Sequence, residues 1–186
     1  LGDGTNTDRA SFVQVQGLNH VVAVAAGLSH SLALRADGTV WAWGSNASGQ
    51  LGDDSGLDSP VPVQVPSLSG VTVIGAGAEH SLAARSDGTL WAWGANWDGQ
   101  LGNGSTTSRT TPVKVGTTLG NVVALAGGSS HSIALRADGT VLSWGAGSSG
   151  QLGNGSTARR LTPTVVPGLS GVRSISVGDS HSLALL

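Results

Sequence analysis

The chain is organised around residues 33–50, ALRADGTVWAWGSNASGQ, a stretch that recurs twice more. The second copy, at 83–100, reads AARSDGTLWAWGANWDGQ, and the third, at 134–151, reads ALRADGTVLSWGAGSSGQ. Each copy has an Asp-Gly pair between two alternating apolar runs, which is a strong sequence signal for a β-hairpin. The stretch therefore predicts an all-β protein assembled from repeated hairpins.

Side-chain size alternates along both strands of this hairpin. In the first copy Leu32 and Leu34 alternate with smaller residues, and so do Trp41 and Trp43. Because alternate residues of a strand point to opposite faces, we expect one bulky face and one small-residue face. Copies of the hairpin would then stack bulky face against small face.

The repeat extends over the whole chain. The motif G-x-x-H-S-[LI]-A occurs four times, at intervals of roughly 50 residues, and its histidines are His30, His80, His131 and His181. The repeats cover 1–50, 51–100, 101–151 and, incompletely, 152–186, and one extra residue in the third lies within 116–118. Each repeat predicts a short P-V-x-V strand, an apolar strand, the His-Ser strand and the Trp strand.

Four antiparallel strands per repeat, with Trp and Gly recurring in register, are typical of a β-propeller. We expect one array over residues 1–186, with three complete units and three strands of a fourth, because the last repeat stops after its His-Ser strand. The alternation with a period of two excludes helical solenoids.

The repeat pattern resembles the regulator of chromosome condensation repeat. The resemblance rests on L-G-[ND]-G-S-T, P-V-x-V and H-S-[LI]-A-L-R-x-D-G-T-[VL]-W-x-W-G-x-N-x-x-G-Q. It implies a seven-bladed propeller, of which this chain would supply about half. It also implies nucleotide exchange on a small GTPase with chromatin binding, and related blades occur in bacterial protein inhibitors of β-lactamase.

Composition excludes several classes of function. The net charge is −2 and charged residues make up 11% of the chain, so there is no basic face for nucleic acid. No apolar run reaches the roughly 20 residues that span a bilayer, and cysteine is absent. We expect no membrane segment, no thiolate chemistry and no cofactor.

The recurring histidines and tryptophans are expected to be structural. Equivalent histidines of stacked sheets lie about 10 Å apart, too far apart to ligate one zinc ion. We therefore expect each imidazole to bond a backbone group beside a glycine-rich strand end. The expected framework residues are His30, His80, His131, His181, Trp43, Trp93 and Trp144.

No catalytic or metal site is predicted. The Asp-Gly carboxylates serve their own turns, and no two acids are placed as a catalytic pair. Calcium remains the less favoured reading of a group of loop aspartates, whose spacing matches no defined calcium loop: Asp3, Asp8, Asp53, Asp54 and Asp58.

Binding is predicted where one copy departs from the others. Trp97 replaces Ala47 and Ser148 of the sibling copies, and Asn96 and Asp98 flank it. A single loop tryptophan is typical of an interface hot spot. The alternative is that Trp97 packs over the edge of the next blade.

These observations predict a non-enzymatic scaffold whose loops bind a protein partner. Its alanine- and glycine-rich composition favours a segment of a bacterial surface or secreted repeat protein. An exchange-factor-like or chromatin-binding propeller and a propeller-type enzyme inhibitor are the alternatives. Because an arc of blades leaves two uncovered ends, we expect either a homodimer that closes a ring or a fragment of a longer propeller chain.

Overall fold

The computed structural model describes residues 1–116 and 118–186, and within them every regular element is a β-strand. Three antiparallel sheets have four strands each and a last sheet has two. The first sheet contains β1 Val21–Ala26, β2 His30–Arg35, β3 Val40–Gly44 and β4 Ser59–Gln64. The second contains β5 Val71–Ala76, β6 His80–Arg85, β7 Leu90–Gly94 and β8 Arg109–Lys114. The third contains β9 Val122–Gly127, β10 His131–Arg136, β11 Val141–Gly145 and β12 Arg160–Val165. The last contains β13 Ser174–Val177 and β14 Ser182–Leu185.

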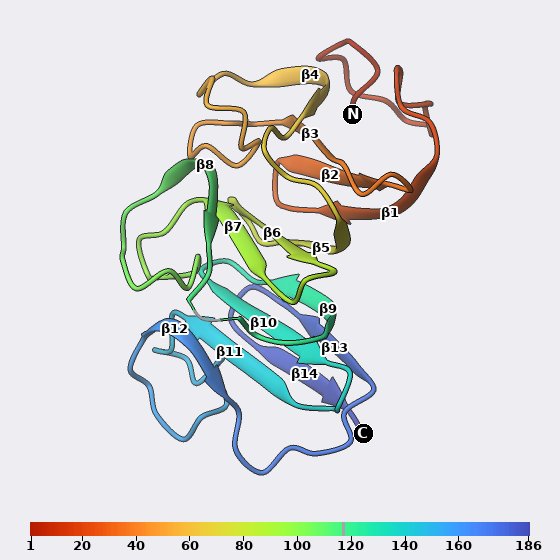
Figure 1. Cartoon of the computed structure of the whole chain (residues 1–186). Helices are drawn as coiled ribbons and strands as arrows, with labels where there is room; N and C mark the ends of the chain where they lie inside the picture. The colour runs from red at the N-terminus through yellow and green to blue at the C-terminus, as the bar shows by residue number, and fades with distance from the viewer. Residues whose placement is uncertain (117) are drawn as a thin grey trace.

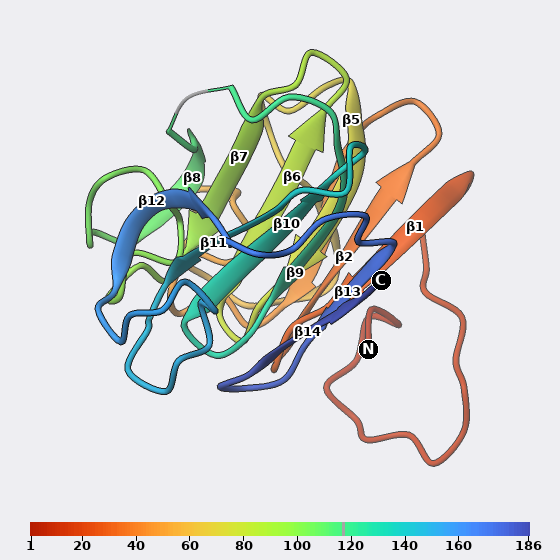
Figure 2. The same ribbon diagram turned by 90° about the horizontal axis from the view of Figure 1, so that it is seen from below.

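The sheets stack face to face as successive blades, with the two chain ends at opposite ends of the stack (Figure 1). The first strands of neighbouring blades contact one another, so β1, β5, β9 and β13 form the inner side of the arc. The view from below looks along the stack, so that the successive blades overlap (Figure 2). The expected fold class, a partial β-propeller of four-stranded antiparallel blades, is confirmed.

The blades are offset by one strand from the sequence repeats. Each P-V-x-V segment pairs with the Trp strand of the preceding repeat, as Val63 does with Ala42. The reason is that the loop after Gly44 returns the chain along the free outer edge of β3, where it adds the fourth strand. The fourth blade therefore has two strands and not the three expected, and the segment around Phe12 has no strand to pair with and forms none.

The expectation of one bulky and one small face is wrong, and the register explains why. Leu32 pairs with Ala42, whereas Ser31 pairs with Trp43. Paired residues share a face, so each face combines one bulky row with one small row. The insertion expected within 116–118 of the third repeat includes residue 117, which lies outside the described residues.

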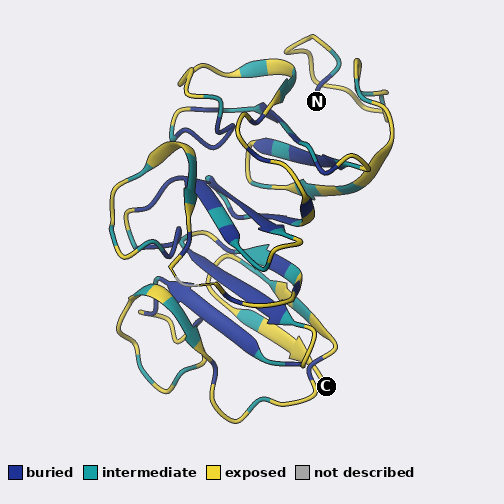
Figure 3. Ribbon diagram, viewed as in Figure 1, coloured by how far each residue is buried: buried dark blue, intermediate teal, exposed yellow. Residues whose placement is uncertain are grey.

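The core lies between blades and not within them, as the buried faces of the central strands show (Figure 3). Leu32, Leu34 and Val40 of the first blade pack against Trp93 and Ala83 of the second. The Leu row of the second blade packs in the same way against Trp144 of the third. The leucine-bearing faces of the first and second blades thus each receive the tryptophan of the next blade.

Backbone contacts join the inner turns of neighbouring blades. Leu28 N–H donates to Ala78 O, Ala78 N–H to Gly128 O, and Ser129 N–H to Asp179 O, at 3.0–3.1 Å. A Cβ on Gly77 would lie 2.7 Å from Gly128 O and would also collide with the His80 ring. Glycine at this position is therefore what permits the blades to approach this closely.

Gly77→Ala should destabilise the fold by about 3 kcal/mol or more, because the Gly128 carbonyl belongs to the backbone of the next blade and limits relaxation. The matched control is Gly104→Ala: no atom lies within 4 Å of its Cβ position, and only the φ of +81° penalises the substitution, at about 1–2 kcal/mol. Chemical denaturation measures both. An equal loss in the two variants would contradict the crowding argument.

Candidate functional site

The framework histidines belong to a hydrogen-bond chain that crosses from one blade to the next. His30 Nε2 lies 3.0 Å from Ser81 Oγ. The Ser81 hydroxyl donates to Gln50 O, and the Trp93 indole N–H donates to the same oxygen, both at 2.8 Å. One backbone carbonyl therefore accepts two hydrogen bonds from the second blade, and one of those donors also binds the histidine of the first.

The same chain recurs at the next junction. His80 Nε2 lies 2.8 Å from Ser132 Oγ, and Ser132 and Trp144 both donate to Gln100 O. At the third junction His131 contacts Ser182, which donates to Gln151 O. Each of these three histidines thus contacts a serine hydroxyl of the next blade and not the backbone group that was expected.

The serine proton fixes the protonation of the imidazole. Because Ser81 and Ser132 each use their only proton on a carbonyl, the neutral histidine must donate from Nε2. Burial lowers the pKa of His80 to about 3 and that of His30 and His131 to about 4. These imidazoles are therefore neutral at pH 7 and donate from Nε2 to the serines of the next blade.

The remaining framework residues divide between the interior and the end of the stack. Trp93 and Trp144 are fully buried, and Trp43 is nearly so. His181 is exposed on the terminal two-stranded blade, and no hydrogen bond to its ring is found among the described residues.

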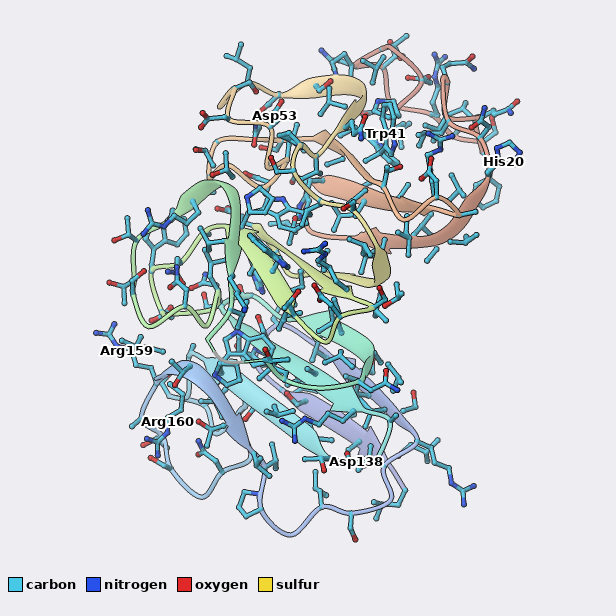
Figure 4. All side chains as sticks on the ribbon, viewed as in Figure 1. His20, Trp41, Asp53, Asp138, Arg159 and Arg160 are labelled. Atoms are coloured by element: carbon cyan, nitrogen blue, oxygen red, sulfur yellow. The ribbon has the colours of Figure 1, made fainter. Side chains whose placement is uncertain are left out.

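The loops that follow the Trp strands form one rim of the stack. They connect β3 to β4, β7 to β8 and β11 to β12. Asp53, Arg159 and Arg160 lie on this side, while Asp138 of an Asp-Gly turn lies at the opposite end of its sheet (Figure 4). We call residues 45–58, 95–108 and 146–159 the loop rim.

Asn96 holds the second rim loop together from inside. Its side-chain amide donates to Asn103, Ser105 and Thr107, and its Oδ1 accepts Leu101 N–H. The residue is fully buried. The prediction that Asn96 contributes to an exposed contact is therefore wrong, and its recurrence as Asn46 reflects the same loop role.

Trp97 is the exposed aromatic residue at the tip of this loop. Its relative accessibility is 60%, whereas the adjacent Asp98 is partly buried. The backbone N–H of Asp98 donates to Gln100 Oε1, which closes the turn. The structure thus brings Trp97 and Asp98 together on the surface, and whether they bind a partner stays a prediction.

Three of the five loop aspartates bond within their own loops, whereas Asp54 accepts a hydrogen bond from the Thr110 hydroxyl on β8. Asp53 accepts hydrogen bonds from Asn46 and Ser55, and Asp58 accepts from the backbone of Asn46. Asp3 pairs with Arg9, with N and O 2.9 Å apart. Within residues 1–116 and 118–186 no three His, Asp or Glu side chains gather around a metal position.

Sequence reasoning did not assign roles to the serine after each framework histidine or to the glutamine that ends each Trp loop. Both recur in register, in H-S-[LI]-A and G-Q-L-G, and that recurrence was the available signal. Their partnership joins residues about 30 positions apart, so the pattern alone could not pair them.

Comparison with known proteins agrees with this architecture. The RCC1-like domain model matches residues 1–186. The chain belongs to the RCC1-like domain family. The resemblance to the regulator of chromosome condensation repeat is thereby confirmed.

This chain matches each individual relative over only part of that relative's length. Mouse RCC1 domain-containing protein 1 is 42% identical over 60 residues, which is 31% of this chain and 16% of that protein. The human WBSCR16 structure superposes with a TM-score of 0.81 at 28% identity, over 93% of this chain and 47% of that one. Prp20p from Saccharomyces cerevisiae gives 0.75 at 26% identity, over 90% and 43%. The chain thus spans less than half of these propellers. No helix among the described residues is long and apolar enough to cross a membrane.

Acidification should destabilise the protein through its buried histidines. Below pH 6.5 an unfolded histidine takes up a proton, whereas folded His80 resists protonation down to about pH 3, so stability falls as the pH is lowered through this window. His80 alone should contribute a loss of about 2 kcal/mol between pH 7.5 and 5. Denaturation at the two pH values measures it.

His80→Gln keeps an N–H donor near Ser132 but cannot titrate, so its stability should depend less on pH than that of the parent. His80→Ala should cost about 1–3 kcal/mol at pH 7.5 by leaving the contact with Ser132 unmade. At pH 5 the cost should be about 2 kcal/mol smaller, because the parent has lost that stability and alanine does not titrate. His20→Gln, in an exposed turn, controls for removal of an imidazole. A glutamine variant with the full acid sensitivity of the parent would contradict the assignment.

Proposed function

We propose that this chain is a non-enzymatic protein-binding module whose contact surface is the loop rim around Trp97. The main observation behind this proposal is that Trp97 is 60% exposed at a position where the other copies have Ala47 and Ser148. The blade does not need an aromatic residue there. A rigid, half-polar side chain of this size is typical of interface hot spots.

The family supports a protein partner. Prp20p is known for binding properties toward Gsp1p and histones, and it has been crystallised with Kap60. These are partners of Prp20p. For this chain we propose a folded protein that contacts the loop rim as the partner, and the net charge of −2 argues against binding to a nucleic-acid backbone.

The chemistry of the histidines supports a non-enzymatic role. Each interior imidazole donates its Nε2 proton to a serine and is buried. The Asp-Gly carboxylates are occupied by the threonine two residues ahead, as Asp37 is by Thr39 at 2.6 Å. The Nδ1 atoms of these histidines have no hydrogen-bond partner, but they are buried and do not reach a substrate for acid–base work.

The relatives named above are eukaryotic proteins, so a bacterial surface or secreted origin rests on composition alone and stays a prediction. Exchange-factor-like activity and enzyme inhibition are both more specific functions that require binding to a protein. A pull-down against a small GTPase and against a target hydrolase distinguishes them from each other.

Trp97→Ala should leave the melting temperature within about 2 °C of the parent, because the side chain is mostly exposed. It should weaken partner binding by about 2 kcal/mol or more if the rim is the contact face. The matched control is Trp93→Ala, which removes a buried tryptophan and should unfold the protein at a far lower temperature. A stability loss of similar size at Trp97 would show that Trp97 packs over the blade edge.

We further propose that the ends of the arc are covered by a second copy of this chain. Val22 and Val24 are exposed on the first blade, and Leu183 and Leu185 on the last. A head-to-tail pair would bring these two faces together around a two-fold axis. Two chains supply six four-stranded blades and two two-stranded ones, an even number of blade positions, as a two-fold axis requires.

Light scattering on the isolated 186 residues should therefore give twice the mass of one chain, and Leu183→Glu should shift it towards one. The charge is placed on the outward face of β14, so the interior of the arc is undisturbed. A concentration of about 100 μM is well above the dissociation constant expected for an interface of this kind. A stable monomer at that concentration would contradict closure by a second copy.

A further inference from the structure

The first rim loop carries an exposed apolar side chain that the repeat does not require. Leu57 occupies a position where the other rim loops have Thr107 and Ala158, and its relative accessibility is 71%. Trp97 is the corresponding departure on the second rim loop. Two neighbouring loops thus each expose one large apolar residue that the sibling loops lack.

Three carboxylates depart from the repeat on the same two blades. Glu79 replaces the serine of the other inner turns, and Asp98 replaces the serine of the other rim loops. Asp54 replaces a glycine and keeps the positive φ of that position, at 65°. Glycine adopts this conformation more readily than aspartate does. The repeat framework therefore does not account for any of these three acidic residues.

Hydrogen bonds place Glu79 in the seam between the two blades. Its Oε2 accepts the hydroxyl of Ser48, on the first rim loop, at 2.7 Å. Its backbone carbonyl accepts Ala95 N–H at 2.8 Å, two residues before Trp97. Glu79 thus lies between the base of the second rim loop and the turn of the first.

The two apolar residues are within reach of one partner surface. The Asn46 side-chain amide donates to Leu57 O, so Leu57 lies next to Ala47 in its own loop. Ala47 is the position equivalent to Trp97, one blade earlier. The two loops lie next to each other along one side of the stack (Figure 1). Because stacked sheets are about 10 Å apart, Leu57 and Trp97 are separated by roughly one blade.

The charge of this part of the rim is opposite to that of the rest of the chain. Segments 45–58, 77–79 and 95–108 contain five of the eleven acidic residues and none of the nine cations. The remaining residues carry nine cations against six acids. The five rim acids are Asp53, Asp54, Asp58, Glu79 and Asp98.

Three of these carboxylates have oxygens available to a partner. Asp54 uses Oδ1 to accept the Thr110 hydroxyl, and Glu79 uses Oε2 to accept Ser48, which leaves one oxygen on each without a bond among the described residues. In the same part of the chain Asp98 bonds through its backbone N–H and not through its carboxylate. We call Asp54, Leu57, Glu79, Trp97 and Asp98 the acidic rim patch.

We propose that the acidic rim patch binds a basic protein segment, with Leu57 and Trp97 as the two apolar contacts. The inference rests on the proposed function and specifies the chemistry of its partner. Lysine or arginine side chains of the partner would meet the three carboxylates, and this charge complementarity excludes acidic partners. The indole of Trp97 can also receive a cation on its face.

The probe is a fluorophore-labelled peptide, GKLGKLGKLGKL, titrated into the 186-residue chain and followed by anisotropy. In an extended peptide its leucines are three residues, or about 10 Å, apart, which matches the separation of the two apolar contacts. GELGELGELGEL keeps the leucines and reverses the charge, and GKSGKSGKSGKS keeps the charge without the leucines. The first peptide should bind saturably, and each of the others at least about fivefold more weakly. The affinity should fall as NaCl is raised from about 0.05 to 0.5 M, because exposed charges are screened.

A triple variant removes the charge of the patch. Asp54→Asn, Glu79→Gln and Asp98→Asn together keep an oxygen acceptor for Thr110 and Ser48. The formal net charge changes from −2 to +1. Binding of the basic peptide should weaken at least about fivefold.

The matched control removes three charges from the Asp-Gly turns, at the opposite end of the sheets (Figure 4). Asp37→Asn, Asp87→Asn and Asp138→Asn together produce the same net charge of +1. This variant should bind the basic peptide within about twofold of the parent, because its rim is unchanged.

Leu57→Thr tests the apolar contact by restoring the residue of the second rim loop. It should weaken the basic peptide by about threefold or more and leave the melting temperature unchanged, because the side chain is exposed. Val123→Thr is the matched control, since Val123 is 46% exposed on β9 and lies outside the loop rim. It should bind as the parent does.

The inference is overturned if the acidic peptide binds as tightly as the basic one, or if the two triple variants weaken binding equally. Failure of all three peptides to bind at about 1 mM, the upper end of weak affinities, also overturns it. If Trp97→Ala weakens binding but Leu57→Thr and the rim triple variant do not, the proposed function stands and this inference fails. If Trp97→Ala leaves binding unchanged, both fail.

Discussion

The structure depends on a carbonyl shared between blades. Gln50 O accepts both the Ser81 hydroxyl and the Trp93 indole, while Ser81 accepts a hydrogen bond from His30. Four side chains or backbone groups from two repeats thus satisfy one another in a site that excludes water. Because a buried donor without a partner costs about 1–3 kcal/mol, no member of the chain can change alone. Adjacent blades are held at one distance and in one orientation.

The apolar packing follows from this arrangement. Once the indole of Trp93 or Trp144 is fixed by its carbonyl, it fills the leucine-bearing face of the preceding blade. Glycines in the inner turns permit the close approach that the hydrogen bonds require, as at Gly77. The hydrogen-bond chain and the apolar core therefore depend on the same side chain, because the indole supplies both a hydrogen-bond donor and a large apolar surface.

Much of this fold could be predicted from the repeat. The Asp-Gly hairpins, the four-strand unit and the buried tryptophans each have a local signal, since turn type and side-chain alternation depend on neighbours in sequence. The candidate site was only partly predictable. Trp97 is exposed, as its difference from the Ala and Ser of the other copies suggested, but Asn96 is buried. Asparagine has the same sequence signal in a solvated turn as in a buried loop, and only the partners at Asn103, Ser105 and Thr107 distinguish them.

By itself the sequence determined the kind of element, the period and the framework residues, because all three are encoded within about 50 residues of continuous chain. Only the tertiary structure decided which strands share a blade. The P-V-x-V segment is nearer in sequence to the strand that follows it than to the preceding Trp strand. It nevertheless pairs with the Trp strand, because the returning loop reaches the free edge of that strand. The structure likewise decided the histidine partner: the serine hydroxyl of the next blade comes within 3.0 Å of His30 only when the sheets stack. Contacts between repeats are set by packing geometry, which no single repeat contains.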